Sequence, residues 1–158
     1  IQLFSALLLL LFVVPWPLAH AQEPKQGIRQ NTFVWDTVNI VTDSGRRHPF
    51  RVEMAITQNQ QFQGLQWRKR LANDAGMLFD FGAMKATGFW MKNTYVSLDM
   101  IFIGQGGEIV EIVHDTTPLS LEVIPSGKPV RGVLEVRAGT AKRLGIKLGD
   151  TVEHRIFQ

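Results

Sequence analysis

The chain has 158 residues and contains no cysteine, which excludes disulfide bonds, a thiolate nucleophile and cysteine-ligated metal sites. Its 17 basic and 14 acidic residues give a formal net charge of +3. The basic residues gather only in two short runs, Arg46–His48 and Arg68–Arg70, so we expect no nucleic-acid partner, because such proteins usually concentrate positive charge on one face.

The N-terminal segment has the features of a secretory signal peptide. Leu7–Val14 is an unbroken apolar run, and Ala19–Ala21 has the small-x-small pattern of a cleavage site. The run is too short for a membrane-spanning helix, which needs about 20 apolar residues, but it fits the apolar region of a signal peptide. We therefore expect residues 1–21 to be removed, leaving a periplasmic or secreted protein with no permanent membrane span.

The rest of the chain divides into a short tether and one domain. Residues 22–31 are rich in polar residues, contain proline and glycine, and show no apolar periodicity, which predicts a flexible tether. Residues 32–158 have a length typical of one domain. We expect this domain to be rich in β-strands.

The domain is predicted to begin with a β-hairpin. Val38–Thr42 is strand-like, and Phe50–Ile56 alternates apolar and polar side chains as a half-buried strand does. Residues 43–45, Asp-Ser-Gly, supply the turn between them.

A short helix should follow the hairpin. Thr57 and Gln60 have the spacing of a capping box, in which each side chain binds the backbone N–H of the other residue. Phe62 and Leu65, three residues apart, would form the buried stripe of this helix.

Period-two alternation predicts further strands beyond the helix. They cover Met77–Phe81, Phe89–Lys92, Leu98–Phe102, Glu108–Val113, Val130–Val136 and Thr151–Phe157. Gly104–Gly107 supplies a hairpin turn, while Ala138, Ala141 and Leu144 predict a second short helix with Gly145 at its end. About seven short strands and two short helices predict a mainly β (α+β) fold, either a small antiparallel β-barrel or a folded-over sheet.

Several motifs resemble the bacterial and archaeal family called domain of unknown function 192. The specific element is the Phe-Trp-Met-Lys-Asn-Thr run at Phe89–Thr94. Supporting elements are Gly64-Leu65, Gly76–Phe79, Leu98-Asp99, Ser126-Gly127, Val133–Glu135, Ala138-Gly139 and Leu144–Asp150. The resemblance extends from about Phe50 to the end, whereas Gln66 and Tyr95–Ser97 depart from the usual pattern. It implies a compact β-rich fold and frequent export, and it supplies no catalytic residues because the family has no established activity.

Strand alternation also suggests where a site lies. Trp90 and Lys92 share one face of their predicted strand, and Arg131 and Glu135 share one face of theirs. Asp99 lies on an otherwise apolar face. If these strands are neighbours, they form a polar cluster around an indole, whose members are Trp90, Lys92, Asn93, Asp99, Arg131 and Glu135.

This cluster supports two interpretations. Lys92 and Arg131 could pair with Asp99 and Glu135 in ion pairs of purely structural importance. Alternatively, the indole could pack on a sugar ring or an aromatic group while Lys92, Asn93 and Arg131 bind its polar rim. The second interpretation predicts a site for a small polar or carbohydrate-like ligand.

Catalytic interpretations find less support in the sequence. Asp99 and Glu135 could form the acid and base pair of a glycoside hydrolase, although neighbouring cations would keep both carboxyls ionised. Ser126 lacks the Gly-x-Ser-x-Gly setting of a hydrolase nucleophile. The histidines lack metal-ligand spacing, and no glycine-rich phosphate loop opens a helix, so we expect no metal and no cofactor.

We therefore expect an exported, non-catalytic binding or accessory module whose site centres on Trp90. The first alternative is a carboxylate-dependent hydrolase or lyase acting on a glycan or cell-wall fragment. The second is a structural or protein-interaction module with an envelope protein as its partner.

Overall fold

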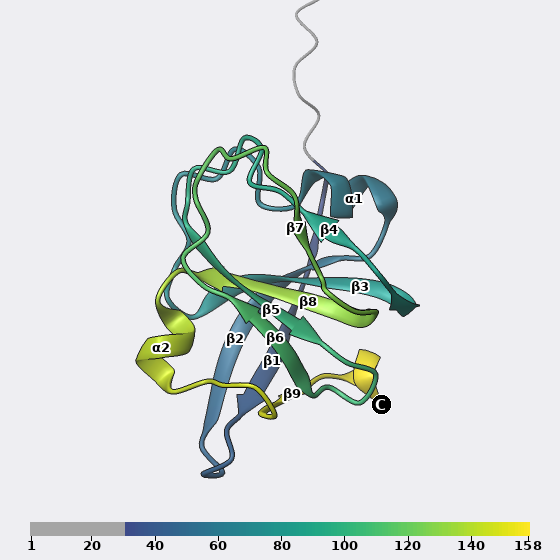
Figure 1. Ribbon diagram of the computed structural model, residues 1–158, viewed down its shortest axis with the longest axis vertical. Helices are drawn as coiled ribbons and strands as arrows, with labels where there is room; N and C mark the ends of the chain where they lie inside the picture. The colour runs from purple at the N-terminus through teal and green to yellow at the C-terminus, as the bar shows by residue number, and fades with distance from the viewer. Residues whose placement is uncertain (1–30) are drawn as a thin grey trace, which may run out of the picture.

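Strands dominate the computed structural model, which describes residues 31–158 (Figure 1). The strands are β1 (Val34–Val41), β2 (Arg47–Ala55), β3 (Ala75–Lys85), β4 (Gly88–Phe89), β5 (Leu98–Ile103), β6 (Ile109–Val113), β7 (Ile124–Pro125), β8 (Val130–Arg137) and β9 (Thr151–Glu153). The helices are α1 (Gln58–Gln63), α2 (Thr140–Leu144) and a 3-10 turn, η1 (Arg155–Phe157). The predicted signal peptide and the predicted tether up to residue 30 lie outside the described residues. No helix of the described part is long and apolar enough to span a membrane.

Seven strands form one curved sheet in the order β6-β5-β8-β3-β2-β1-β9. Its two edges meet, because Glu108 forms an isolated bridge with Thr151 and the Val152 N–H donates to the Gly107 carbonyl at 2.7 Å. The sheet is thus a nearly closed, barrel-like structure, which confirms the predicted mainly β fold with two short helices.

One strand pair differs from the expected antiparallel arrangement. β2 and β3 run parallel, with Val52 opposite Gly76. A parallel pair needs a long crossover connection, and the chain between Ala55 and Ala75 provides it, carrying α1 to one end of the molecule (Figure 1).

The local predictions for the first hairpin and helix are partly correct. β1 and β2 form the expected antiparallel hairpin, and Thr57 and Gln60 make both hydrogen bonds of the capping box at the start of α1. The predicted burial of Phe62 is wrong, because its side chain is 66% exposed, whereas Leu65 is buried just beyond the helix. A spacing of three residues does not reveal which face of so short a helix meets the sheet.

Two predicted strands are shorter than their alternation suggested. β4 ends at Phe89 and pairs only with β7, in a separate two-stranded ribbon. After it, the Met91 N–H donates to the Ser120 carbonyl, outside any ladder. The final strand ends at Glu153, where His154 begins the 3-10 turn by accepting from the Ile156 N–H.

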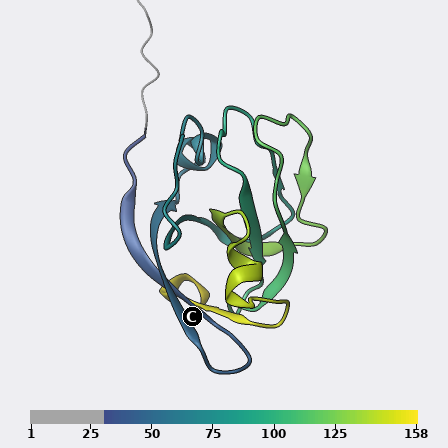
Figure 2. The same ribbon diagram turned by 90° about the vertical axis from the view of Figure 1, so that its left-hand side faces the viewer.

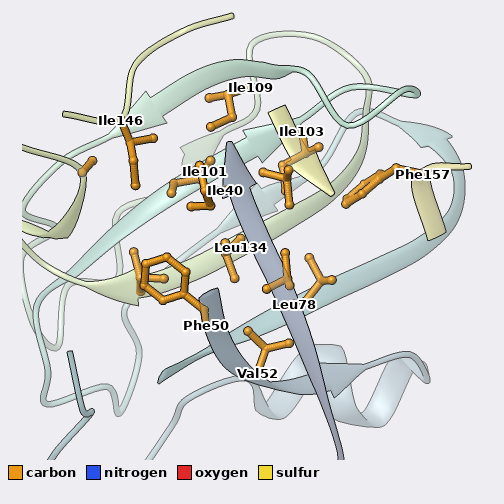
Figure 3. Close-up of a cluster of buried hydrophobic side chains, with 14 of the residues drawn as sticks. Ile40, Phe50, Val52, Leu78, Ile101, Ile103, Ile109, Leu134, Ile146 and Phe157 are labelled. Carbon is orange, nitrogen blue, oxygen red and sulfur yellow. The ribbon is translucent and has the colours of Figure 1, made fainter. Parts of the chain in front are cut away.

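Apolar side chains fill two layers, one on each face of the curved sheet. Figure 3 shows the inner cluster, to which β5 contributes Ile101 and Ile103 and β8 contributes Leu134. Met100 and Phe102 point outward into a second cluster. β5 is consequently buried along its whole length.

The outer cluster includes Phe89 of β4, Ile124 of β7 and loop residues such as Leu71. Figure 2 shows the ribbon of the same structure after a turn of 90°. Leu65 and Met91 reach it from the loops that follow α1 and β4. This second layer positions the candidate site.

Candidate functional site

A cavity of about 220 Å³ lies in the outer layer, where α1 and β4 meet the outward face of β3 and β8. Most of its walls come from aromatic and glutamine side chains. Its lining residues are Gln61, Phe62, Gln63, Gly64, Leu65, Gln66, Phe79, Phe81, Lys85, Thr87, Gly88, Phe89, Trp90, Thr94 and Glu135. We call this cavity the aromatic pocket.

Glu135 is the buried acid of the aromatic pocket. It lies in the middle of β8, only 4% exposed, with Met77 of β3 and Met100 of β5 as its register partners. Within residues 31–158 its carboxyl group makes neither a hydrogen bond nor an ion pair. Burial among these apolar neighbours raises the pKa of Glu135 from its ordinary 4.5 to about 8, so most of the carboxyl is protonated at neutral pH.

Aromatic rings build the inner wall of the pocket. The Phe89 ring packs edge-to-face on Phe79, with centroids 5.0 Å apart, and on Phe102, with centroids 6.0 Å apart. Edge-to-face packing is a favourable arrangement for aromatic pairs. Phe89 of β4 therefore holds the wall in place.

Two further rings line the aromatic pocket and are open to solvent. Trp90 is 38% exposed and Phe62 is 66% exposed. They contact each other edge-to-face, with ring centroids 6.1 Å apart. Exposed aromatic groups beside a concave surface are typical of ligand-binding sites.

The glutamine side chains of the lining form hydrogen bonds with other parts of the protein. Gln61 donates from Nε2 to the Asp80 carbonyl at 2.7 Å, and Gln66 donates from Nε2 to the Phe62 carbonyl at 2.8 Å. Gln63 accepts from the Asn31 N–H at 2.6 Å. These bonds fix α1 and the following turn, so the glutamines maintain the shape of the pocket.

The structure brings three of the six predicted site residues together. Trp90 and Glu135 both line the aromatic pocket, and the Lys92 ammonium lies 5.2 Å from the centroid of the Trp90 ring. Asn93 is nearby but engaged: it has a positive φ of 56° and donates from Nδ2 to Gln66 Oε1 at 3.1 Å.

Asp99 and Arg131 do not line the aromatic pocket, and the expectation of one shared polar wall is wrong for Asp99. Asp99 lies on the other face of the sheet, where its carboxylate accepts from the Asp115, Gly139 and Ala141 N–H groups. Arg131 forms a largely buried ion pair with Asp80. The pairing of Lys92 and Arg131 with Asp99 and Glu135 is also absent from the ion pairs of the described residues.

Sequence reasoning missed Phe62 and Lys85 as lining residues. Phe62 looked like a core residue, and Lys85 lies in the part of β3 beyond the predicted strand. Ser126 is structural, because its hydroxyl donates to the Lys128 carbonyl and accepts from the Thr87 N–H. Among residues 31–158, no group of three or more histidine, aspartate or glutamate side chains is placed to hold a metal ion.

The fold and the pocket define a class of protein: a small barrel-like β domain with an aromatic pocket in the layer that covers its outer face. The chain belongs to the DUF192 family, described as "Uncharacterized ACR", whose family model matches residues 39–154. This match confirms the resemblance based on the Phe89–Thr94 motif.

Two solved structures show the same fold at high sequence identity. A protein from Sinorhizobium meliloti 1021, whose description suggests a transcription regulator, is 45% identical with a TM-score of 0.77, covering 78% of this chain and 96% of its own. A protein of unknown function from Novosphingobium aromaticivorans DSM 12444 is 38% identical with a TM-score of 0.73, covering 76% of this chain and 85% of its own. No curated protein matches this sequence.

Proposed function

We propose that this protein is a non-catalytic module that binds a small molecule in the aromatic pocket. One observation carries the proposal: Glu135 is buried in a cavity wall without a protein partner, beside a cavity that two exposed aromatic side chains also line. The carboxyl oxygens of Glu135 are not among the fully enclosed, unpartnered side-chain atoms of the described residues, so they reach the cavity. A ligand in the pocket would provide the missing partner.

The composition of the lining supports ligand binding. Pockets for small molecules combine apolar and aromatic walls with a few polar groups that fix orientation. Here Phe79, Phe81 and Phe89 supply the walls, and Glu135 supplies a polar group on the inner side. Trp90 offers an indole surface against which a flat apolar part of a ligand can pack.

The geometry gives less support to the hydrolase alternative. That mechanism needs two carboxyl groups facing one substrate, but Asp99 and Glu135 lie on opposite faces of the sheet. Asp99 is also fully buried and occupied by three backbone N–H groups.

The binding proposal can be tested by tryptophan fluorescence. We expect at least one member of a panel of monosaccharides, muropeptides, amino acids and aromatic acids to change the emission of the parent protein saturably. Trp90→Ala and Phe62→Ala should each weaken binding about tenfold or more, the size expected for losing a packed aromatic contact. Binding by the variants is measured by calorimetry, because Trp90→Ala also removes an emitting group.

Trp35→Ala is the matched control, since Trp35 is similarly exposed, at 43%, but packs against Arg51 rather than the pocket. It should leave binding unchanged. Equal binding by the parent and by a folded Trp90→Ala variant would exclude the aromatic pocket as the site.

We also propose that the protein acts outside the cytoplasm. The apolar run Leu7–Val14 and the small-x-small pattern at Ala19–Ala21, both outside the described residues, support this location. Cell fractionation and N-terminal sequencing of the expressed chain provide the test. A mature form that starts at Gln22 in the exported fraction is expected, and an uncleaved cytoplasmic product would contradict export.

A further inference from the structure

Building on the binding function proposed above, we propose that the occupant of the aromatic pocket is a small zwitterion with an apolar body. Its ammonium group would bind the carboxylate of Glu135, and its anionic group would bind the ammonium of Lys85. The substrate class is thus that of free amino acids and similar amino acid-like molecules.

The charges of the lining suggest this ligand class. Glu135 and Lys85 are the two charged residues among those that line the pocket. In the described part of the chain, neither has a hydrogen-bonding or ion-pairing partner: Glu135 is buried between methionines, and the Lys85 ammonium lies 4.4 Å from the centroid of the Phe81 ring. Neither group is therefore paired within the described residues: Lys85 is an exposed cation, and Glu135 is a buried acid that is mostly neutral in the empty pocket.

These two residues do not compensate each other. No ion pair joins them, and the raised pKa of Glu135 has burial as its cause, with no contribution from a neighbouring cation. A cation and a buried acid that share a cavity without touching are complementary to a ligand with an anionic group at one end and an ammonium group at the other, because the ammonium group favours the ionised form of the acid. Charge-assisted hydrogen bonds at both ends would be stronger than neutral ones.

Several of the other polar side chains in the lining form hydrogen bonds within the protein. The three glutamines hold α1 and the adjoining turn, as described above, and the Thr94 hydroxyl donates to the Lys92 carbonyl at 3.2 Å. A sugar needs hydrogen-bonding groups around its whole ring, whereas the walls of this cavity are largely aromatic, and Lys85 and Glu135 are its ionisable groups. Aromatic rings also attract ammonium groups through their faces.

The size of the cavity limits the ligand. At about 220 Å³ it is smaller than the roughly 300–1,000 Å³ of pockets for drug-sized molecules. Leu65, Phe79 and Phe81 line it, so the middle of the ligand should be apolar.

Three related probes separate the contributions of the two charges. L-phenylalanine carries both an ammonium and a carboxylate, phenethylamine carries only the ammonium, and 3-phenylpropanoate carries only the carboxylate. Calorimetry at neutral pH should show L-phenylalanine binding about tenfold or more tightly than either single-charge probe, because it makes one more charge-assisted contact. L-leucine and L-methionine extend the panel in case the ring is too large.

Two variants assign each charge to its partner. Glu135→Gln should bind L-phenylalanine no more tightly than 3-phenylpropanoate, because the ammonium group has lost its partner. Lys85→Met, which keeps the apolar stem, should bind L-phenylalanine no more tightly than phenethylamine, because the carboxylate has lost its partner. Lys142→Met, an exposed lysine on α2, is the control and should bind as the parent does. Circular dichroism confirms that each variant is folded.

Proton release provides an independent readout. Because Glu135 is mostly protonated when the pocket is empty, an ammonium ligand should displace its proton on binding. Calorimetry in buffers with different ionisation enthalpies measures this release. The parent should release a proton with L-phenylalanine, and Glu135→Gln should release none.

The outcomes separate this inference from the binding function. A neutral ligand that binds in a Trp90-dependent way, with no zwitterion binding at millimolar concentration, would overturn the zwitterion inference and leave the binding function intact. Binding of L-phenylalanine that is insensitive to both variants would also overturn the inference. If no probe of any class binds, both proposals fail.

Discussion

Asp99 and Glu135 come from adjacent strands but point to opposite faces of the sheet. Met100 of β5 lies opposite Glu135 of β8 in the register, and Asp99 lies opposite Val136. Successive residues of a strand alternate between faces, so Asp99 joins the layer of Ile101, and Glu135 joins the outer layer. The two acids consequently have different surroundings: Asp99 is surrounded by backbone N–H groups, whereas Glu135 lines the aromatic pocket.

We predict that Asp99→Ala destabilises the fold strongly. The Asp99 carboxylate accepts from Ala141 N–H at 2.9 Å, Asp115 N–H at 3.1 Å and Gly139 N–H at 3.2 Å, and so anchors the start of α2. A buried donor left unsatisfied costs about 1–3 kcal/mol, so the loss should be about 3 kcal/mol or more. Urea unfolding followed by circular dichroism measures it.

The control for this prediction is Asp74→Ala. Asp74 is exposed, and its side chain makes no hydrogen bond or ion pair within residues 31–158, so its removal should change the free energy of unfolding by less than about 0.5 kcal/mol. Equal unfolding midpoints for Asp99→Ala and Asp74→Ala would show that the carboxylate of Asp99 is not an anchor.

Strand pairs that are close in the sequence could be predicted, whereas distant pairs could not. The turn at residues 43–45 and the glycines at 104–107 join alternating segments, and both hairpins are present. Alternation also placed Asp99 correctly on the face of Ile101. It contains no information about the register between distant strands, and so Asp99 of β5 was wrongly grouped with Glu135 of β8, although these two strands are neighbours.

The candidate site could be predicted only in part, because strand alternation gives the face of a residue but not its tertiary contacts. The alternation places Trp90 on one strand face with Lys92 and Glu135 on one strand face with Val133 and Arg131, and the structure places Trp90 and Glu135 in the pocket lining. Phe62 was missed because an aromatic residue in a short helix looks the same whether it faces the core or a pocket. Its 66% exposure depends on how α1 meets the sheet, which is a tertiary property.

We predict that closure of the barrel depends on Gly107. This residue has a φ of +89°, and an added Cβ atom would lie 2.4 Å from the Val152 carbonyl oxygen at the point where the sheet edges meet. The positive φ alone should cost about 1–2 kcal/mol with alanine, and the contact with the carbonyl must add to this. Gly107→Ala should therefore lower the stability by more than about 2 kcal/mol.

The neighbouring Gly106 gives a matched control for Gly107→Ala. An added Cβ at Gly106 meets no atom within 4 Å, so Gly106→Ala should leave the thermal midpoint nearly unchanged. Hydrogen exchange of the Val152 N–H, which donates across the seam, should accelerate only in Gly107→Ala. Unchanged exchange there would contradict the assigned role of this glycine.

The last prediction concerns the pH dependence that Glu135 gives to the fold. In the unfolded chain its carboxyl loses a proton near its ordinary pKa of 4.5, whereas burial raises the pKa in the folded protein to about 8. Between these values the folded state binds more protons than the unfolded state, so this residue lowers stability as pH rises. The slope is at most about 1.4 kcal/mol per pH unit, giving a total of about 5 kcal/mol as an upper limit.

Glu135→Gln removes this titration while nearly preserving the size of the side chain. The difference in the free energy of unfolding between variant and parent should be constant below about pH 4.5. From there to about pH 8 the variant should become progressively more stable than the parent, and above about pH 8 the difference should again be constant. Urea unfolding of both proteins across this range measures the difference. Glu122→Gln, at an exposed position, controls for the loss of a carboxylate. A difference between variant and parent that stays constant with pH would mean that Glu135 ionises normally in the folded protein, and that the aromatic pocket does not contain a neutral acid.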